Sequence, residues 1–173
     1  MTSILKVDNI QKANGSVPKA SDLGINTTGS VLQVVQSRNN GATIATTSNT
    51  LIDTGISLSI TPSSTSNKIL ITANFTGTSS TTNVTGGTLY ALYRNGTTNV
   101  FSGATSGDGM LQYNSSGSSY NHGVSQLSYL DSPSSASATT YGIYMSRLGS
   151  GTSSIQRDWG GVTMIAMEIA GWI

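Results

Sequence analysis

The chain has 173 residues, enough for one domain and a short appendage, and 36% of them are hydrophobic. Charged residues make up only 9% and sum to a net charge of +1, which argues against binding to nucleic acid or to an anionic membrane. The absence of cysteine excludes disulfides and thiolate metal sites, and no apolar run is long enough to predict a transmembrane helix. Polar positions are filled instead by 29 Ser and 24 Thr, with 20 Gly, a composition that suits strands and tight turns.

The first 30 residues differ from the rest of the chain. Their only apolar cluster is followed by turn-forming residues, and it consists of Ile4, Leu5, Val7 and Ile10. We predict that residues 1–30 form an extended arm, in which Ile4–Ile10 is a candidate short strand. The arm would attach the chain to a partner subunit or to another protein. A frayed terminus without function is the alternative.

From residue 31 onward, short segments with alternating or β-branched side chains predict strands separated by turns. The clearest segment is Lys68–Thr76, where four apolar side chains at every second position share one face. Further strands are predicted at Val31–Ser37, Thr43–Thr47, Leu51–Ile60, Leu89–Arg94 and Asn99–Ser102. Asp53-Thr54-Gly55 predicts a bulge or kink, Ser79–Gly87 a loop, and Asn95-Gly96 a tight turn.

A long span rich in Gly, Ser and Asn runs from Gly103 to Gly123, with a short strand expected at Met110–Tyr113. Aromatic rings and amides gather in this span, and both are common on adaptable binding loops. The candidate ligand-binding residues are Tyr113, Asn114, Tyr120, Asn121 and His122. Packing of the tyrosines against the sandwich is the alternative.

Strands are then predicted at Val124–Leu130, Thr139–Arg147 and Val162–Ala170. The last of these is apolar on both faces, so both faces should be covered. We expect Ile165 to face the core. We expect the other face, with Met164, Ala166 and Trp172, to contact a neighbouring subunit in a homo-oligomer.

Nine or ten short strands at regular spacing, with no helical segment between them, predict an all-β protein. We expect a jelly-roll-like antiparallel β-sandwich head over residues 31–173, preceded by the arm.

Residues with the chemistry of catalysis are scarce. The single histidine, His122, lies in no nucleophile motif, and no pair of carboxylates is set apart by a motif. One histidine without cysteine cannot hold zinc within one protomer. Ser106-Gly107-Asp108-Gly109 is typical of a turn more than of a calcium loop. We therefore expect a protein that is not an enzyme and needs no metal or cofactor.

Several segments in a characteristic order give the chain a resemblance to a family. They are Ile4–Gln11, Gly29–Val35, Ile60–Ile71, Leu92–Gly96, and Tyr129–Pro133 ahead of Thr139-Thr140-Tyr141. In this order they resemble fibre and spike proteins of tailed bacteriophages, especially marine phages that infect cyanobacteria and related hosts. The resemblance implies a homotrimer on the virion, with a β-sandwich head, an N-terminal attachment segment and no shared catalytic residues. The chain departs from the family in having no long stalk.

Two functions remain open from the sequence. One is adhesion, in which trimeric heads present their loops to a glycan or protein of the host surface. The other is a capsid decoration, cement or head-fibre role, in which the arm and apolar strand faces bind other virion proteins.

Overall fold

The computed structural model describes residues 11–17, 28–81, 86–101, 110–114, 119–156 and 160–171. The strands of this part are β1 (Val31–Asn39), β2 (Ile44–Thr46), β3 (Ile52–Ile60), β4 (Lys68–Thr81), β5 (Gly86–Arg94), β6 (Thr98–Asn99), β7 (Met110–Asn114), β8 (Ser119–Asp131), β9 (Thr139–Gly149), β10 (Thr152–Gln156) and β11 (Val162–Ile169). No helix among the described residues is long and apolar enough to cross a membrane.

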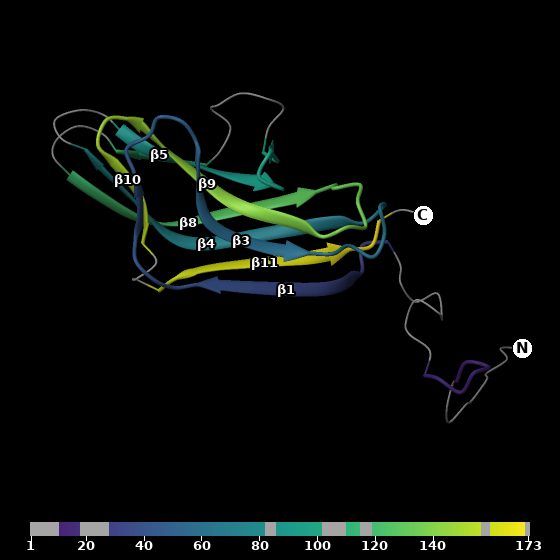
Figure 1. Ribbon diagram of the computed structural model, residues 1–173. Helices are drawn as coiled ribbons and strands as arrows, with labels where there is room; N and C mark the ends of the chain where they lie inside the picture. Colours follow the sequence, from purple (N-terminus) through teal and green to yellow (C-terminus); the bar gives the residue numbers. More distant parts are fainter. Residues whose placement is uncertain are drawn as a thin grey trace, which may run out of the picture.

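The strands form two antiparallel sheets that face each other (Figure 1). Sheet A is built on β4, which pairs with β8 along one edge over its whole length. The other edge of β4 pairs first with β11 and then with β10, and these two strands are flanked by β1 and β2. Sheet B has the order β3-β9-β5, and both β6 and β7 pair with the far edge of β5.

The strand order confirms the predicted all-β sandwich of jelly-roll type. The main strands of sheet A run β1-β11-β4-β8 and those of sheet B run β3-β9-β5-β7. Consecutive main strands alternate between the sheets except β5 and β7, which pair within sheet B, and this is how two interlocked Greek keys arrange eight strands. As a result, β1 begins and β11 ends at the same end of the sandwich (Figure 1).

Apolar side chains from both sheets fill the space between them. Phe75 of β4 meets Tyr90 of β5 edge to face, with ring centroids 4.8 Å apart, and the Tyr90 hydroxyl donates to the Ser154 carbonyl oxygen at 3.0 Å. Burial raises the pKa of the Tyr90 hydroxyl, which therefore stays protonated as a donor. The largest fully buried apolar side chains are Tyr90, Tyr141, Ile56, Ile69, Ile71, Leu92, Leu127, Ile143, Met145, Ile155 and Met164.

The interior changes character along the strands. Toward the end of the sandwich where β4 finishes and β5 begins, several buried inward positions carry hydroxyls in place of alkyl groups. Thr88 donates to the Thr78 carbonyl oxygen at 3.2 Å, and Ser153 donates to the Gly87 carbonyl oxygen at 3.1 Å. These bonds satisfy groups that would otherwise be costly to bury.

The face of β11 that meets the core is opposite to the predicted one. Met164 and Ala166 are fully buried between the sheets, so their predicted place in a subunit interface is wrong. Ile165, predicted for the core, points outward and is half-buried. Both faces of this strand carry apolar residues, so hydrophobicity alone could not choose between them. Trp172 lies outside the described residues.

Most predicted strands are present, with different limits. β4 and β8 are longer than expected: β4 continues to Thr81 inside the predicted Ser79–Gly87 loop, and β8 begins at Ser119 inside the predicted loop span. Of the predicted strand Asn99–Ser102, only Asn99 is in a strand, β6, while Val100 and Phe101 lie in a turn and Ser102 lies outside the described residues. β10 was not predicted, because its sequence Thr-Ser-Ser-Ile-Gln shows one large apolar residue.

Two local predictions are confirmed. The register of β3 against β9 shifts between Asp53 and Ser57, and Gly55 within the shift has a φ of 69°, as a bulge requires. Asn95 and Gly96 have φ values of 51° and 71°, so both central residues of the β5–β6 turn adopt the positive φ of a type I′ hairpin.

The corrected orientation of β11 gives a direct prediction. Met164→Asp places an unpaired carboxylate in the core and should abolish the folded protein. Ile165→Asp places the same group outward between Gln36 and Thr72, its neighbours on the adjacent strands, and should retain the fold. Far-UV circular dichroism of the two purified variants distinguishes them. A folded Met164→Asp beside an unfolded Ile165→Asp would contradict the orientation.

Candidate binding surfaces

The predicted ligand residues lie in strands, not in a free loop. Tyr113 and Asn114 end β7, where they pair with Gly87 and Gly86 of sheet B. Tyr120, Asn121 and His122 lie near the start of β8, where they pair with Ser80, Ser79 and Thr78 of sheet A. The two groups therefore come from facing sheets at one end of the sandwich, which we call the distal end. Apart from that of His122, their side chains lie outside the described residues.

His122 is exposed on β8. Its Nδ1 lies 2.9 Å from the Thr78 hydroxyl on the paired position of β4, which fixes the ring against the neighbouring strand. No group of three or more His, Cys, Asp or Glu side chains that could hold a metal ion occurs in the part of the chain that the structure describes.

The arm joins the sandwich at the opposite end, which we call the proximal end. The Gly29 amide donates to the Ala170 carbonyl oxygen and the Ala170 amide donates to the Ser30 carbonyl oxygen, both at 2.9 Å. Residues 28–30 therefore extend the pairing of β1 with β11. Within the arm, residues 11–17 form an exposed turn, in which the Gly15 amide donates to the Lys12 carbonyl oxygen at 2.8 Å. Ile4, Leu5, Val7 and Ile10 lie outside the described residues.

A buried carboxylate lies at the proximal end. Glu168 of β11 is 1% exposed. Its Oε1 accepts from the Ser63 amide at 2.6 Å, the Ser63 hydroxyl at 2.7 Å and Asn67 Nδ2 at 2.6 Å. Its Oε2 accepts from Gln33 Nε2 at 2.6 Å, and the same Gln33 nitrogen donates to the Thr61 carbonyl oxygen. One side chain thus joins β1, β11 and the loop between β3 and β4.

All four of these donors are uncharged, yet they favour the ionised form. Burial raises the pKa of Glu168, but the hydrogen bonds from Asn67, Ser63 and Gln33 outweigh it, so the pKa lies below its usual value. The sequence analysis did not single out Glu168. The signal was available: one acid in an otherwise apolar strand needs donors, and the Ser63–Asn67 segment of the preceding loop is rich in them.

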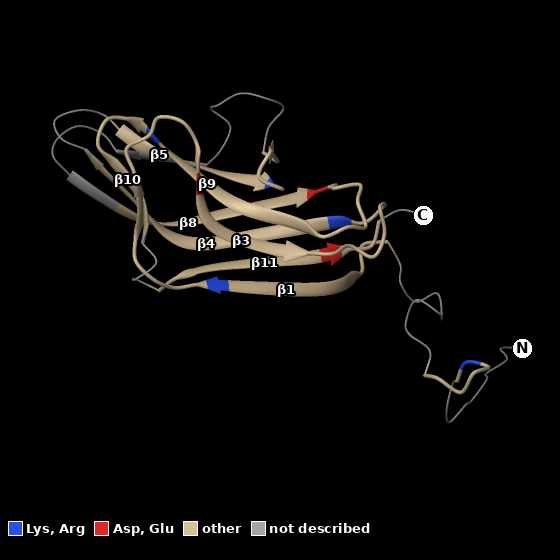
Figure 2. Ribbon diagram, in the orientation of Figure 1, with Lys and Arg blue, Asp and Glu red and all other residues tan. Residues whose placement is uncertain are grey.

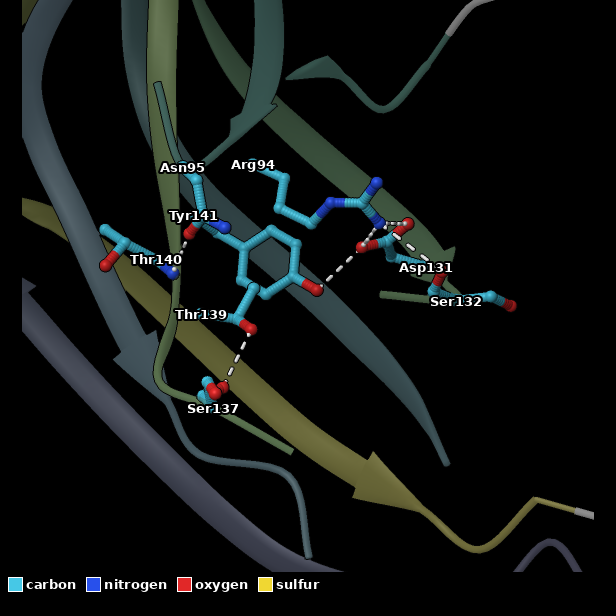
Figure 3. A network of polar contacts seen from close by, with 8 residues as sticks. All are labelled: Arg94, Asn95, Asp131, Ser132, Ser137, Thr139, Thr140 and Tyr141. Carbon is cyan, nitrogen blue, oxygen red and sulfur yellow. Dashed lines mark hydrogen bonds and ion pairs between the residues drawn. The ribbon is translucent and has the colours of Figure 1, made fainter. Parts of the chain in front are cut away.

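A second polar group links the sheets at the proximal end (Figure 3). Arg94 Nη1 of β5 lies 2.9 and 2.8 Å from the two carboxylate oxygens of Asp131, the last residue of β8. The Tyr141 hydroxyl donates to Asp131 Oδ2 at 2.7 Å. Burial and the Asp131 carboxylate raise the pKa of the Tyr141 hydroxyl, which keeps it a donor. The group stabilises the contact of β8 with β5 and β9.

Two tyrosines lie together on the outer face of sheet B. The rings of Tyr93 and Tyr144 stack with centroids 4.0 Å apart, over the position of Gly142. Burial and the nearby Asp53 carboxylate raise the pKa of the Tyr144 hydroxyl. Beside them Ala91 pairs with Tyr144 and is buried, while Asp53, Ser57 and Ser59 are exposed along the edge strand β3.

Comparison with family models and with curated proteins finds no match. Among solved structures, the chain is similar to a structure of the Gx strain of infectious bursal disease virus, at 11% identity and a TM-score of 0.36 over 81% of this chain and 41% of that chain. It is also similar to a mutant VP2 protein of this virus in derived T=1 particles, at 12% identity and a TM-score of 0.35 over 80% of this chain and 36% of that chain. The chain thus spans about two fifths of the length of these viral chains, and a likeness of this size carries no inference about function.

The Glu168 contacts predict acid sensitivity. A carboxyl whose pKa is lowered by folding contributes stability above its unfolded pKa of about 4.3, and this contribution is lost as the pH falls through the lower folded value. Glu168→Gln leaves donors facing an amide NH₂ and should lower the free energy of unfolding by roughly 1–3 kcal/mol at pH 7. The difference between wild type and variant should shrink as the pH is lowered toward about 3. Urea unfolding at several pH values measures this difference in the free energy of unfolding. A difference that does not depend on pH would contradict an ionised, hydrogen-bonded Glu168.

Proposed function

We propose that this chain is a non-enzymatic structural protein of a phage virion. In this proposal three copies associate, the arm of residues 1–30 binds another virion protein, and the distal end faces the host surface and binds a glycan or protein there. The resemblance to phage fibre and spike proteins suggests the setting. The geometry of the sandwich supports the division of roles between its two ends.

The observation that carries the proposal is that the two ends of the sandwich have different features. The arm enters beside Ala170 at the proximal end, and the candidate ligand residues lie where β7 ends and β8 begins, at the distal end. The central strand β4, with 14 residues, runs between these ends and spans about 45 Å. A rigid body of this kind can be attached at one end and present the other end to a second partner.

The residues at the distal end suit binding without catalysis. They offer aromatic rings, amides, hydroxyls and one imidazole, which are the groups that contact sugars and polar protein surfaces.

The alternative is a decoration, cement or head-fibre protein that stabilises the particle. One observation favours it: the candidate ligand residues are held in paired strands, so they have less freedom to adapt to a ligand than loop residues would. In that role the distal end would lie on the surface of the particle and would bind no host receptor.

Binding to host cells tests the adhesion role. Purified protein should bind cells of the host strain, and Tyr113→Ala and Tyr120→Ala should reduce binding at least tenfold while leaving the circular dichroism spectrum unchanged. Ser57→Ala, on the outer face of sheet B, serves as the matched control and should bind like wild type. Absence of binding by wild-type protein, when intact particles do bind, would reject adhesion.

Deletion of residues 1–27 tests the attachment role of the arm. The deletion retains the pairing of residues 29 and 30 with Ala170, so the sandwich should fold, but the protein should no longer be incorporated into particles. Gel analysis of purified particles measures incorporation, and cryo-electron microscopy locates the wild-type chain. Unchanged incorporation would contradict the role of the arm. Density on capsid lattice axes in place of the tail would favour decoration.

A further inference from the structure

The outer face of sheet A carries a row of apolar side chains across four strands. The strand register aligns Val34 of β1 with Met167 of β11, Met167 with Leu70 of β4, and Leu70 with Leu130 of β8. Val34 is 57% exposed and Leu130 46% exposed, while Met167 and Leu70 between them are half-buried. The row therefore crosses the face from one edge strand to the other.

Neighbouring positions extend the row into a patch. Toward the proximal end, Val31, 53% exposed, pairs with the half-buried Ile169. Toward the distal end, Ile165 lies between Gln36 and Thr72. We call these seven apolar residues the sheet A patch: Val31, Val34, Leu70, Leu130, Ile165, Met167 and Ile169.

The edge strand β3 of sheet B shows the side-chain alternation that this chain uses where one face meets water. Along β3 of sheet B the outward residues Asp53, Ser57 and Ser59 are all exposed and polar, while the inward residues are apolar. This is the usual alternation of a sheet with one solvated face. The sheet A patch departs from it, and an exposed apolar cluster of this extent is typical of an interaction site.

The charges around the sheet A patch limit what can cover it. Lys68 lies at its proximal margin and Arg38 beyond its distal margin, and no patch residue is charged (Figure 2). Arg38 Nη2 also donates to the Gly160 carbonyl oxygen. Among the described residues, the charged side chains at the margins of the sheet A patch are positive and none lies within it. The patch therefore offers a partner no charge pattern to match, and a flat uncharged apolar surface fits it best.

A second copy of this chain supplies such a surface, namely its own sheet A patch. A face of four strands, each about eight residues long, covers about 500 Å² in plan, which is the same order as the roughly 800 Å² that each partner buries in a standard interface. In a closed rotational arrangement every copy buries the same patch, so no apolar surface remains uncovered.

We propose that the outer face of sheet A is the surface through which copies of this chain associate around a common axis. This inference rests on the self-association in the proposed function and assigns it to residues. It leaves sheet B and the distal end outside the association surface. It also explains why β11 is apolar on both sides: Met164 and Ala166 face the protomer core, while Ile165, Met167 and Ile169 face the other copies.

Single lysine substitutions in the full-length protein test the surface. Val34→Lys and Leu130→Lys bring like charges together in the associated form, and should weaken association at least tenfold with an unchanged circular dichroism spectrum. Ser57→Lys adds the same charge to the outer face of sheet B and should retain the wild-type mass. Sedimentation equilibrium over a range of concentrations measures the mass. If the wild type is an oligomer and neither patch variant changes its mass, the assignment of the association surface is wrong but the proposed association stands. If the wild type is a monomer, both are wrong.

Because the chain contains no cysteine, a single introduced thiol can be labelled specifically. This second measurement adds no charge to the surface. Leu130→Cys and Ser57→Cys each introduce a single thiol that a maleimide can label. Labelling at position 130 should be at least tenfold slower than at position 57 in concentrated protein, and it should become faster on dilution as the copies separate. Equal labelling rates at high concentration would overturn the proposal. Slow labelling at position 130 that does not change on dilution, in a protein that is monomeric, would also overturn the proposal. That result would indicate that the arm of residues 1–30 covers the sheet A patch.

Discussion

The register of β4 is the constraint on which the rest of the sandwich depends. This strand pairs with β8 along one edge and with β11 and β10 along the other, so its alternation decides which side chains of all three partners face inward. Because side chains alternate with a period of two, a slip of one residue would exchange the core face with the outer face across sheet A. Ile69, Ile71, Ala73 and Phe75 exclude that slip, since the opposite face of the same strand carries Thr72 and Asn74.

That constraint also explains which predictions were correct. β4 has one apolar and one mixed face, so its sequence alone assigned its inward residues correctly. β11 has two apolar faces, and its orientation follows from pairing with β4, which a sequence does not show. Glu168 adds to the ambiguity: it lies on the inward face because Ser63, Asn67 and Gln33 supply donors, and all four of these hydrogen bonds join residues more than 100 positions apart in the chain.

The candidate site was predicted less fully than the fold. The sequence placed its aromatic and amide residues near one another, and the structure brings the two groups to one end through the facing sheets. It could not show that these residues belong to paired strands, because Gly and Ser are common neighbours both in loops and in strands of this chain. β10 was missed for a related reason: Ser153 and Ser154 are buried through hydrogen bonds and not through hydrophobicity.

The place where the arm joins the sandwich has a mechanical consequence. β1 begins at the proximal end and lies antiparallel to β11, with paired positions from Val31–Ile169 to Asn39–Val162. If the distal end is fixed and the arm is pulled, the force acts along the axis of β1. The hydrogen bonds between β1 and β11 run perpendicular to that axis. The whole β1–β11 ladder then bears the load in shear, and its bonds must break together instead of opening one after another. A sandwich pulled in this way resists extraction of β1 far better than one whose terminal strand could be peeled from its end.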